Sequence, residues 1–476
     1  MALKKVNLPE NFILGAAASA WQTEGWTGKT EKNMNYMDGW YKAVPELWHD
    51  GIGPTVAADL YNRYKEDARL MKEVGLNAFR TSIDWSRFIK DYETGEVNEE
   101  AVQFYNDYID EIKKNGVEPM ICLEHYELPL YLFEKYGGWG SKKVVDLFVK
   151  YAEQAFKYFG HKVKYWFTFN EPIVVQTRVY LDAIRWPYEQ NTAKWMQWNH
   201  NKNLANAKVV KLFKELGMEG KIGAILNPEV TYPRSSAEHD KKAAYMYDLY
   251  FNRVFMDPML KGKYPQDLIN DLKKHNCMFD YTEEELEIIK NNTIEFLGLN
   301  LYYPHRVKAR STAWNEEIPF HPARYYELFD LPGKKMNPFR GWEIYPKIIY
   351  DIGIRLKEEY NNVEWIVAES GMGVQNEAQY KNEDGQIQDD YRIEYISQHL
   401  YWTLKAIEDG SNCKGYMLWA FMDNVSPQNA FKNRYGLVEV NLEDNRNRRI
   451  KKSGNWYKEV QENRSFELEI FENEYK

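Results

Sequence analysis

One pattern constrains the fold of this chain more than any other: a short apolar run followed by a longer amphipathic stretch recurs eight times. The alternation is typical of βα units, which build a parallel sheet. Eight parallel strands separated by helices close into a (β/α)8 barrel, whose buried strands read as near-continuous apolar runs. The sequence therefore predicts an α/β fold, a (β/α)8 TIM barrel. The predicted strands are residues 12–18, 78–83, 118–123, 165–169, 222–226, 294–299, 365–368 and 416–421.

The amphipathic stretches have helical spacing. In the first of them Leu60, Tyr64, Ala68 and Met71 recur at intervals of three and four, which places them on one helix face. The later strands are also followed by helical patterns. The helices predicted in the first half of the chain are residues 56–74, 99–115, 141–159 and 195–215.

The chain reads as a single domain, residues 1–476, because no Gly/Ser-rich or Pro-rich linker, low-complexity tract or fixed repeat interrupts it. Its length would allow two or three domains of ~100–200 residues, but one barrel can exceed ~400 residues. The extra length falls in three long segments, residues 24–54, 173–194 and 305–341. Loops of this length are usually functional, and we expect these three to frame the barrel mouth.

The charge balance argues against nucleic acid as a partner, since 71 acidic side chains exceed 62 basic ones and give a net charge of −9. The basic residues 446–452 (RNRRIKK) are expected to form a solvated loop. A mean hydropathy of −0.67 and the lack of a run of ~18 apolar residues argue against a membrane partner. The N-terminal residues 1–10 lack the apolar stretch of a signal peptide, so we expect a cytoplasmic protein.

The cysteines point to no special chemistry. Cys122, Cys277 and Cys413 lie far apart, without CxxC or Cys/His spacing. Their odd number also argues against a disulfide framework. We expect ordinary free thiols, no metal and no cofactor.

Polar residues just after the apolar runs are the candidates for chemistry, since catalytic groups in this fold come from the carboxyl ends of its strands. Glu171 follows the fourth predicted strand, and Glu369 follows the seventh. A single glutamate in such a place is more often a helix cap or a salt-bridge partner. Two of them at one mouth suit glycoside hydrolysis, which needs one acid for the leaving group and one carboxylate for the sugar.

Further side chains at strand ends converge on the same place. Gln22, His125 and Asn170 can hold sugar hydroxyls by hydrogen bonds, and Trp419 offers a flat apolar surface for a sugar ring. Taken singly, His125 could be a core histidine and Trp419 could fill the barrel. Their positions at different strand ends favour a shared site.

Arg80, in the second predicted strand, and Tyr302, after the sixth, complete the set. An arginine beside a carboxylate favours the ionised form, although Arg80 could equally form a structural ion pair.

The chain resembles glycoside hydrolase family 1 over residues 12–457, nearly its whole length. The matching motifs are FILGAAASAWQTEG (residues 12–25), FRTSIDWSR (79–87), LEHYELP (123–129), GGWGS (137–141), YWFTFNEP (165–172), FLGLNLYY (296–303) and GYMLWAFMDN (415–424). The family contains β-glucosidases, β-galactosidases and 6-phospho-β-glycosidases, all on a single (β/α)8 barrel with retaining chemistry.

The resemblance implies that Glu171 is the general acid/base and Glu369 the nucleophile. It places Gln22, His125, Asn170 and Trp419 at positions that hold the sugar, and the roles require a raised pKa for Glu171 and an ionised Glu369 supported by Arg80 and Tyr302. Two departures accompany it. The residues around the nucleophile read Ala-Glu-Ser-Gly instead of Thr-Glu-Asn-Gly, and those after His125 read Tyr-Glu instead of aromatic-Asp.

The segment after the eighth predicted strand bears on the substrate. Members that cleave unphosphorylated sugars carry a glutamate where this chain has Ser426, and a carboxylate would repel a 6-phosphate. The phospho-specific members resemble this chain in that serine and in Tyr435. Their lysine position is Asn433 here, and the nearest lysine is Lys432, so either Lys432 reaches the phosphate, Asn433 donates a neutral hydrogen bond, or the segment is simply solvated.

The expected substrate is a small-molecule β-glycoside carrying a 6-phosphate. The tryptophan that phospho-galactosidases share beside the serine is Pro427 here, which favours 6-phospho-β-glucosides. A β-glucosidase or β-galactosidase for unphosphorylated sugars, and a 6-phospho-β-galactosidase, are the alternatives. The sequence does not decide between a monomer and a homo-oligomer.

Overall fold

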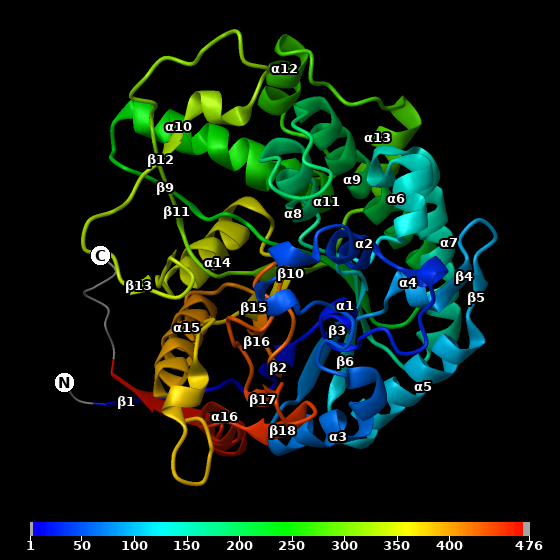
Figure 1. Ribbon diagram of the computed structural model, residues 1–476. Helices are drawn as coiled ribbons and strands as arrows, with labels where there is room; N and C mark the ends of the chain where they lie inside the picture. Colours follow the sequence, from blue (N-terminus) through cyan, green and yellow to red (C-terminus); the bar gives the residue numbers. More distant parts are fainter. Residues whose placement is uncertain (1–2, 470–476) are drawn as a thin grey trace.

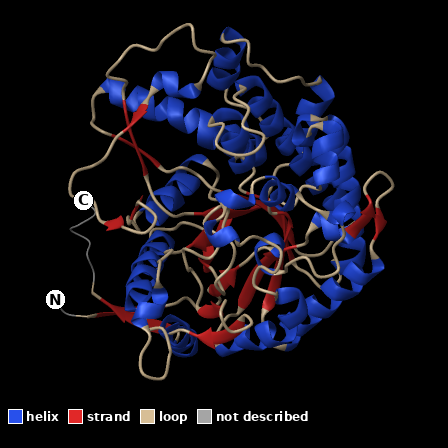
Figure 2. Ribbon diagram, in the orientation of Figure 1, coloured by secondary structure: helices blue, strands red, loops and turns tan. Residues whose placement is uncertain are grey.

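The computed structural model describes residues 3–469, and its centre is a closed barrel of eight parallel strands (Figures 1 and 2). Neighbouring strands follow the chain order, and the last strand pairs with the first. The strands are β2 (Ile13–Ala17), β3 (Ala78–Ser82), β6 (Glu118–Glu124), β7 (Tyr165–Asn170), β8 (Lys221–Leu226), β10 (Phe296–Asn300), β15 (Glu364–Ser370) and β16 (Cys413–Trp419).

The fold prediction is confirmed, and seven of the eight predicted strands differ from the observed ones by at most two residues at either end. The last one is the exception, because β16 begins at Cys413, three residues before the predicted start, and ends at Trp419. Its first residues are polar or small, so they carry no apolar signal. Gly415 is required there, since a Cβ at this residue would lie 2.4 Å from Cβ of Ile13 in the paired strand β2.

Helices surround the barrel, as Figure 2 shows, and the four predicted in the first half are present. They are α3 (Leu60–Glu73), α5 (Glu99–Lys114), α7 (Lys142–Phe159) and α9 (Thr192–Glu215). Helix α5 illustrates why these segments are helical. The Asn98 side chain accepts a hydrogen bond from the Glu100 main chain, acidic residues occupy the first turn and lysines the last, all of which favour a helix there.

The second half adds α10 (Glu238–Asp248), α11 (Val254–Lys261), α12 (Gln266–Lys274), α13 (Glu283–Asn291), α14 (Ile348–Glu359), α15 (Asp390–Glu408) and α16 (Lys452–Asn463). Short helices in the loops are α1 (Ala20–Thr23), α2 (Tyr36–Ala43), α4 (Trp85–Phe88), α6 (Leu130–Tyr136) and α8 (Val174–Gln176). The strands outside the barrel are β1 (Lys4–Asn7), β4 (Ile89–Asp91), β5 (Glu96–Val97), β9 (Thr231–Pro233), β11 (His305–Lys308), β12 (Glu327–Leu328), β13 (Met336–Asn337), β14 (Trp342–Glu343), β17 (Val438–Asn441), β18 (Asn447–Ile450) and β19 (Ser465–Leu468).

Two apolar layers hold the barrel together. One lies between the strands and the surrounding helices. The other fills the barrel interior with buried side chains from its strands: Ala78, Met120, Cys122, Phe167, Ile225, Phe296, Ile366, Ala368 and Met417. The interior is therefore a packed core and not a channel, so chemistry is restricted to the mouth.

The expectation of a solvated loop at residues 446–452 is wrong. Residues of this segment form β18, which pairs antiparallel with β17. The Arg448 side chain is fully buried and paired with Asp67, with 2.8 Å between Nε and Oδ1. Its partner lies far away in the sequence, so a local reading of the basic run could not find it.

Lys451 of the same segment belongs to a buried group that we call the C-terminal cluster: Glu377, Asp389, Arg392, Asp423 and Lys451. Lys451 pairs with Glu377 and, at 2.8 Å, with Asp423, and Arg392 pairs with Glu377 and, at 2.9 Å, with Asp389. The Arg392 guanidinium also donates to the main-chain oxygen of Tyr435 at 3.1 Å. The cluster therefore fixes the chain around Tyr435.

The remaining general expectations concern the cysteines and the membrane. Cys122, Cys277 and Cys413 are buried free thiols. Within residues 3–469, the helices are too short or too polar to cross a membrane.

Candidate active site

A cavity of about 340 Å³ opens at the carboxyl ends of the barrel strands. Both glutamates selected from the sequence line it, together with Gln22, His125, Tyr302 and Trp419. Long segments 173–194 and 305–341 also contribute side chains, as expected, whereas segment 24–54 supplies none of the described lining residues. That first segment instead supports its neighbour, because the Tyr36 hydroxyl donates to the Trp186 main-chain oxygen at 2.6 Å.

Glu369 lies near the end of β15 among donors from other strands. The Arg80 guanidinium pairs with its Oε1, and the Tyr302 hydroxyl donates to its Oε2 at 2.7 Å. Arg80 is fully buried, and Glu369 is 4% exposed. Directly after β15, Gly371 allows a close approach of the chain, since a Cβ there would lie 1.8 Å from the Trp419 main-chain oxygen. This close approach fixes the chain two residues after Glu369 against the end of β16.

Burial raises the pKa of Glu369 to about 7. Arg80 and the Tyr302 hydroxyl oppose this effect, and the nearby charge of Glu171 reinforces it. The sequence argument expected Arg80 and Tyr302 to keep Glu369 ionised. Both contacts are present, but desolvation outweighs them in the free protein, so Glu369 exchanges its proton near neutral pH.

Glu171 follows β7 and reaches the same cavity from another side of the barrel. Its main chain adopts a left-handed conformation, with φ of 47°, and its N–H donates to the Ile225 oxygen of β8 at 2.8 Å. The Tyr126 hydroxyl donates to one carboxyl oxygen, and the Asn300 amide donates to the other at 2.9 Å. We call Arg80, Glu171, Tyr302 and Glu369 the pocket cluster.

A chain of side chains connects the predicted sugar contacts. His125 contacts Arg80 through Nδ1 at 2.9 Å and the Asn170 amide through Nε2 at 3.1 Å. Its ring stacks against Trp419 with a centroid distance of 5.8 Å. Burial and Arg80 hold the pKa of His125 well below its usual range, so the ring is neutral. Arg80 and Asn170 lie behind the cavity wall, and their contacts orient the residues that face it.

Gln22 connects the first strand to the segment after the last one. Its amide donates to the Val425 main-chain oxygen at 2.6 Å, and its side-chain oxygen accepts from the Ser19 hydroxyl at 2.7 Å. The side chain is 4% exposed and lines the cavity. Its position is therefore set before a ligand binds.

The structure separates the four candidate phosphate-binding residues into two pairs. Ser426 and Tyr435 line the cavity, whereas Lys432 and Asn433 do not. Lys432 is exposed and lines a different pocket, with Asp50 and Phe431. Asn433 is buried, with its amide 3.4 Å from the Asn429 side-chain oxygen. The structure therefore gives no support to the alternative in which Lys432 binds the phosphate. Among the described residues that line the cavity, the segment after β16 contributes no cation.

The contributors to the site that the sequence reasoning missed include Asn300, Trp342, Arg340 and Tyr126, whose hydroxyl donates to Glu171. Asn300 ends β10 and faces Glu369 in register, so the rule that selected the other strand ends could have found it. Trp342 and Arg340 come from the end of the long segment 305–341 and the residues just after it. Their position there depends on loop conformation, for which the sequence carried no signal.

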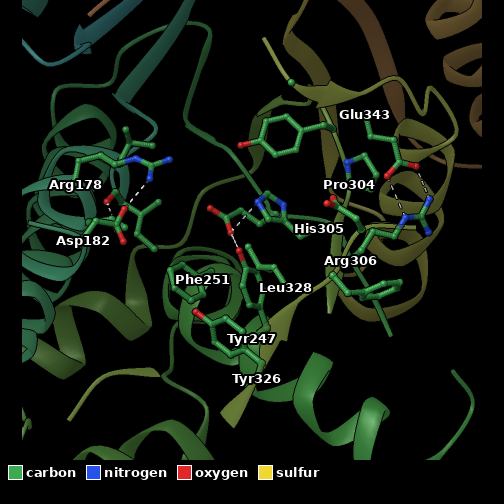
Figure 3. Close-up of a pocket in the computed structure, with 18 of the residues that line it drawn as sticks. Arg178, Asp182, Tyr247, Phe251, Pro304, His305, Arg306, Tyr326, Leu328 and Glu343 are labelled. Carbon is green, nitrogen blue, oxygen red and sulfur yellow. Dashed lines mark hydrogen bonds and ion pairs between the residues drawn. The ribbon is translucent and has the colours of Figure 1, made fainter. Parts of the chain in front are cut away.

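A second cavity of about 380 Å³ adjoins the first and shares Val174, Arg178, Glu229, Tyr303 and His305 with it. Figure 3 shows its polar walls, where Arg178 pairs with Asp182 at 2.7 Å and Arg306 pairs with Glu343 at 2.6 Å. Glu229 accepts from the Tyr247 hydroxyl and lies 3.3 Å from His305 Nε2. The adjoining cavity extends the mouth beyond the two glutamates with paired charges and aromatic rings.

Two carboxyls in one water-accessible cavity, one held by a guanidinium and a phenol, can divide an acid role and a nucleophilic role between them. The comparisons with known proteins agree with this chemistry. The model of glycosyl hydrolase family 1 matches residues 4–466.

The chain belongs to glycosyl hydrolase family 1.

Relatives in family 1 extend along the whole chain. The 6-phospho-beta-glucosidase GmuD of Bacillus subtilis is 47% identical over 463 residues, covering 97% of this chain and 99% of that protein. A 6-phospho-beta-galactosidase of Clostridium acetobutylicum is 37% identical, and the match covers 95% of this chain and 97% of that protein. Among solved structures, the family 1 β-glucosidase of Thermotoga maritima superposes with a TM-score of 0.87 at 31% identity, covering 97% and 99%. This family 1 member is therefore a glycoside hydrolase.

Proposed function

We propose that this glycoside hydrolase is a retaining enzyme for 6-phospho-β-glucosides, with Glu171 as general acid/base and Glu369 as nucleophile. The observation that carries the proposal is the asymmetry of the two carboxyls in one cavity. Arg80 and Tyr302 donate to Glu369, whereas Tyr126 and Asn300 donate to Glu171. A carboxylate that must attack carbon benefits from a fixed orientation, and a full positive charge beside it favours its ionised form.

In the first step the ionised Glu369 attacks the anomeric carbon, and the bond to the leaving oxygen breaks. Glu171 gives its proton to that oxygen, so the aglycone departs as an alcohol. The product is a glycosyl ester on Glu369, whose charge is thereby lost. Glu171 thus loses the proton that the departing oxygen gains, and the electron pair of the broken glycosidic bond stays on that oxygen.

In the second step Glu171, now ionised, removes a proton from water, and the water oxygen attacks the anomeric carbon. The ester bond breaks, and Glu369 leaves as a carboxylate beside Arg80. Two inversions at one carbon give net retention. A neutral His125 and the amide of Gln22 would hold the sugar hydroxyls, and Trp419 would carry the ring face. Asn170 would orient His125 from behind the cavity wall.

The phosphate specificity is supported by the donors at one end of the cavity. Ser426 and Tyr435 both line it and can donate hydrogen bonds to phosphate oxygens. A carboxylate at the place of Ser426 would instead repel a dianion. GmuD, which is named as a 6-phospho-β-glucosidase, is a relative over nearly the full length of the chain. Pro427 beside Ser426 favours a gluco substrate over a galacto substrate.

The adjoining cavity gives the aglycone a place. Its walls are paired charges and hydroxyl-bearing rings, which suit a second sugar better than an apolar group. We therefore assign it the leaving sugar of a phosphorylated disaccharide. The whole chain acts as one catalytic domain in this proposal, and the phosphorylated substrate places the reaction in the cytoplasm, because a dianion does not cross membranes freely.

Parallel assays test the substrate. The wild-type protein should turn over nitrophenyl β-glucoside 6-phosphate with a higher kcat/KM than nitrophenyl β-glucoside. Equal or better turnover of the unphosphorylated compound would identify an ordinary β-glucosidase. The corresponding pair of galactosides in the same assay tests the gluco preference.

A Glu171→Ala variant tests the mechanism. Nitrophenolate leaves without an acid, so the first step should proceed, while the second step lacks its base. The glycosyl-enzyme should then accumulate, and its added mass should appear on the peptide that contains Glu369. A label on any other peptide, or no burst of nitrophenolate, contradicts the assigned roles.

A further inference from the structure

We propose that Arg340 supplies the positive charge of the phosphate site, in the place of a lysine on the segment after β16. The inference rests on the proposed phosphate specificity and goes beyond it by naming the specificity-determining cation. Arg340 lines the same cavity as Ser426 and Tyr435, although it comes from the long segment 305–341.

The guanidinium of Arg340 is free to bind a ligand. Its Cζ lies 4.4 Å from the centroid of the Trp342 ring, so it stacks on an aromatic face. Within residues 3–469 it forms no ion pair with a carboxylate, and its buried Nε has no hydrogen-bond partner. A guanidinium that stacks through its face keeps its N–H edges available for the paired oxygens of a phosphate.

The backbone around Arg340 is tied to the phosphate candidates. The Gln375 amide donates to the Phe339 oxygen at 3.1 Å, and the Asn337 amide donates to the Gly373 oxygen at 3.0 Å. Gly373 in turn lies against the ring of Tyr435, because a Cβ there would lie 2.5 Å from Cζ of the tyrosine. These contacts place the Arg340 segment beside Tyr435.

Electrostatics agree with this placement. Burial raises the pKa of Tyr435, and the positive charge of Arg340 opposes that rise. The charge of Arg340 therefore reaches the phenol that would share the phosphate.

The other cations around the cavity are engaged or lie elsewhere. Arg178 pairs with Asp182 at 2.7 Å. Arg185 stacks over Trp40 at 5.2 Å, and its charge acts on Tyr126 and Glu171, at the acid/base end of the site. Lys432 is exposed in another pocket. Among the described residues that line the cavity, Arg340 is thus the cation at the end that Ser426 and Tyr435 form.

The test measures the selectivity ratio, defined as kcat/KM for nitrophenyl β-glucoside 6-phosphate divided by kcat/KM for nitrophenyl β-glucoside. Arg340→Met keeps a long side chain against Trp342 but removes the charge. The ratio should fall roughly 10- to 100-fold, the worth of a charge-assisted hydrogen bond. Arg340→Lys should restore part of the ratio, because it restores the charge without the planar fork.

Lys432→Met is the matched control, since it removes one positive charge outside the cavity and should leave the ratio as in wild type. A purely structural role of Arg340 would slow both substrates together, and the ratio would not move. If the selectivity ratio of Arg340→Met stays within about twofold of the wild-type ratio, the inference about Arg340 is overturned. The proposed function still stands in that case, provided that the wild-type protein prefers the phosphorylated substrate. A wild type that prefers the unphosphorylated glucoside overturns both.

Discussion

The pocket cluster and the C-terminal cluster both bring carboxyls and cations together, and they differ in how completely the charges of their buried carboxyls are neutralised. In the pocket cluster one cation, Arg80, pairs with Glu369, and the nearby charge of Glu171 opposes the ionisation of that carboxyl. In the C-terminal cluster Arg392 and Lys451 serve three carboxylates, Asp423 also lies 3.6 Å from Arg434, and Asp389 accepts from the hydroxyl of Ser453 at 2.6 Å.

The difference appears in the pKa values. Burial raises the pKa of Glu369 to about 7 in the pocket cluster. Burial acts on Asp423 as well, but Lys451 and Arg434 hold its pKa below the usual value. A buried carboxyl that lacks full compensation exchanges protons, and one with full compensation serves the fold. Substitutions in the two clusters should therefore have different effects, given below from the largest to the smallest.

Glu369→Gln should abolish nearly all hydrolysis. The loss of the nucleophile is expected to lower kcat by roughly 10⁴-fold or more, since amide nitrogen and oxygen cannot form the glycosyl ester. Nitrophenolate release measures it. If the variant retains a tenth of the wild-type rate, Glu369 is not the nucleophile.

Lys451→Met should instead act on stability. It leaves Glu377 and Asp423 without their shared cation, and breaking a buried pair costs about 3–5 kcal/mol of unfolding free energy. Lys452→Met is the control, because its pair with Asp390 is solvent-exposed and worth about 0–1 kcal/mol. Urea unfolding compares the two. Equal losses would show that the cluster has no special role.

Glu369→Gln should also change how the stability of the fold depends on pH. The pKa of Glu369 is raised from 4.5 to about 7. The folded protein therefore binds more protons than the unfolded chain between these values, and its stability falls as the pH rises through them. The neutral variant avoids that loss, so its stability relative to wild type should rise by at most about 3 kcal/mol between pH 4 and pH 8. Thermal unfolding at both pH values measures the gain.

Tyr302→Phe should shift the acid limb of the pH profile of kcat/KM upwards by roughly 0.5–1 pH unit. The phenol stabilises the ionised form of Glu369 and so lowers its pKa, and removing it lets the pKa rise. The variant therefore needs a higher pH to ionise its nucleophile. A limb that stays in place or moves down would show that the hydroxyl does not act on Glu369.

Strand ends were predictable from the sequence, and loop ends were not. The alternation of apolar and amphipathic segments reports local periodicity, so it located the barrel and placed Glu171 and Glu369 at its mouth. The C-terminal cluster escaped, because a basic run reads as solvated unless its distant partners are known. Arg340 escaped for a related reason: its position depends on contacts of Asn337 and Gln375 between the long segment 305–341 and the residues after β15.

The segment that carries Ser426 and Tyr435 has a thermodynamic consequence for binding. The main chains of Ser426 and Ala430 bond reciprocally at 2.9 and 2.8 Å, and Arg392 holds the Tyr435 oxygen at 3.1 Å. A ligand that arrives here does not have to order the main chain of the segment, which avoids a conformational-entropy cost of about 1–2 kcal/mol for each residue that would otherwise have to be fixed. Because the segment is already ordered, the binding free energy of a ligand here is set mainly by the contacts that the ligand makes.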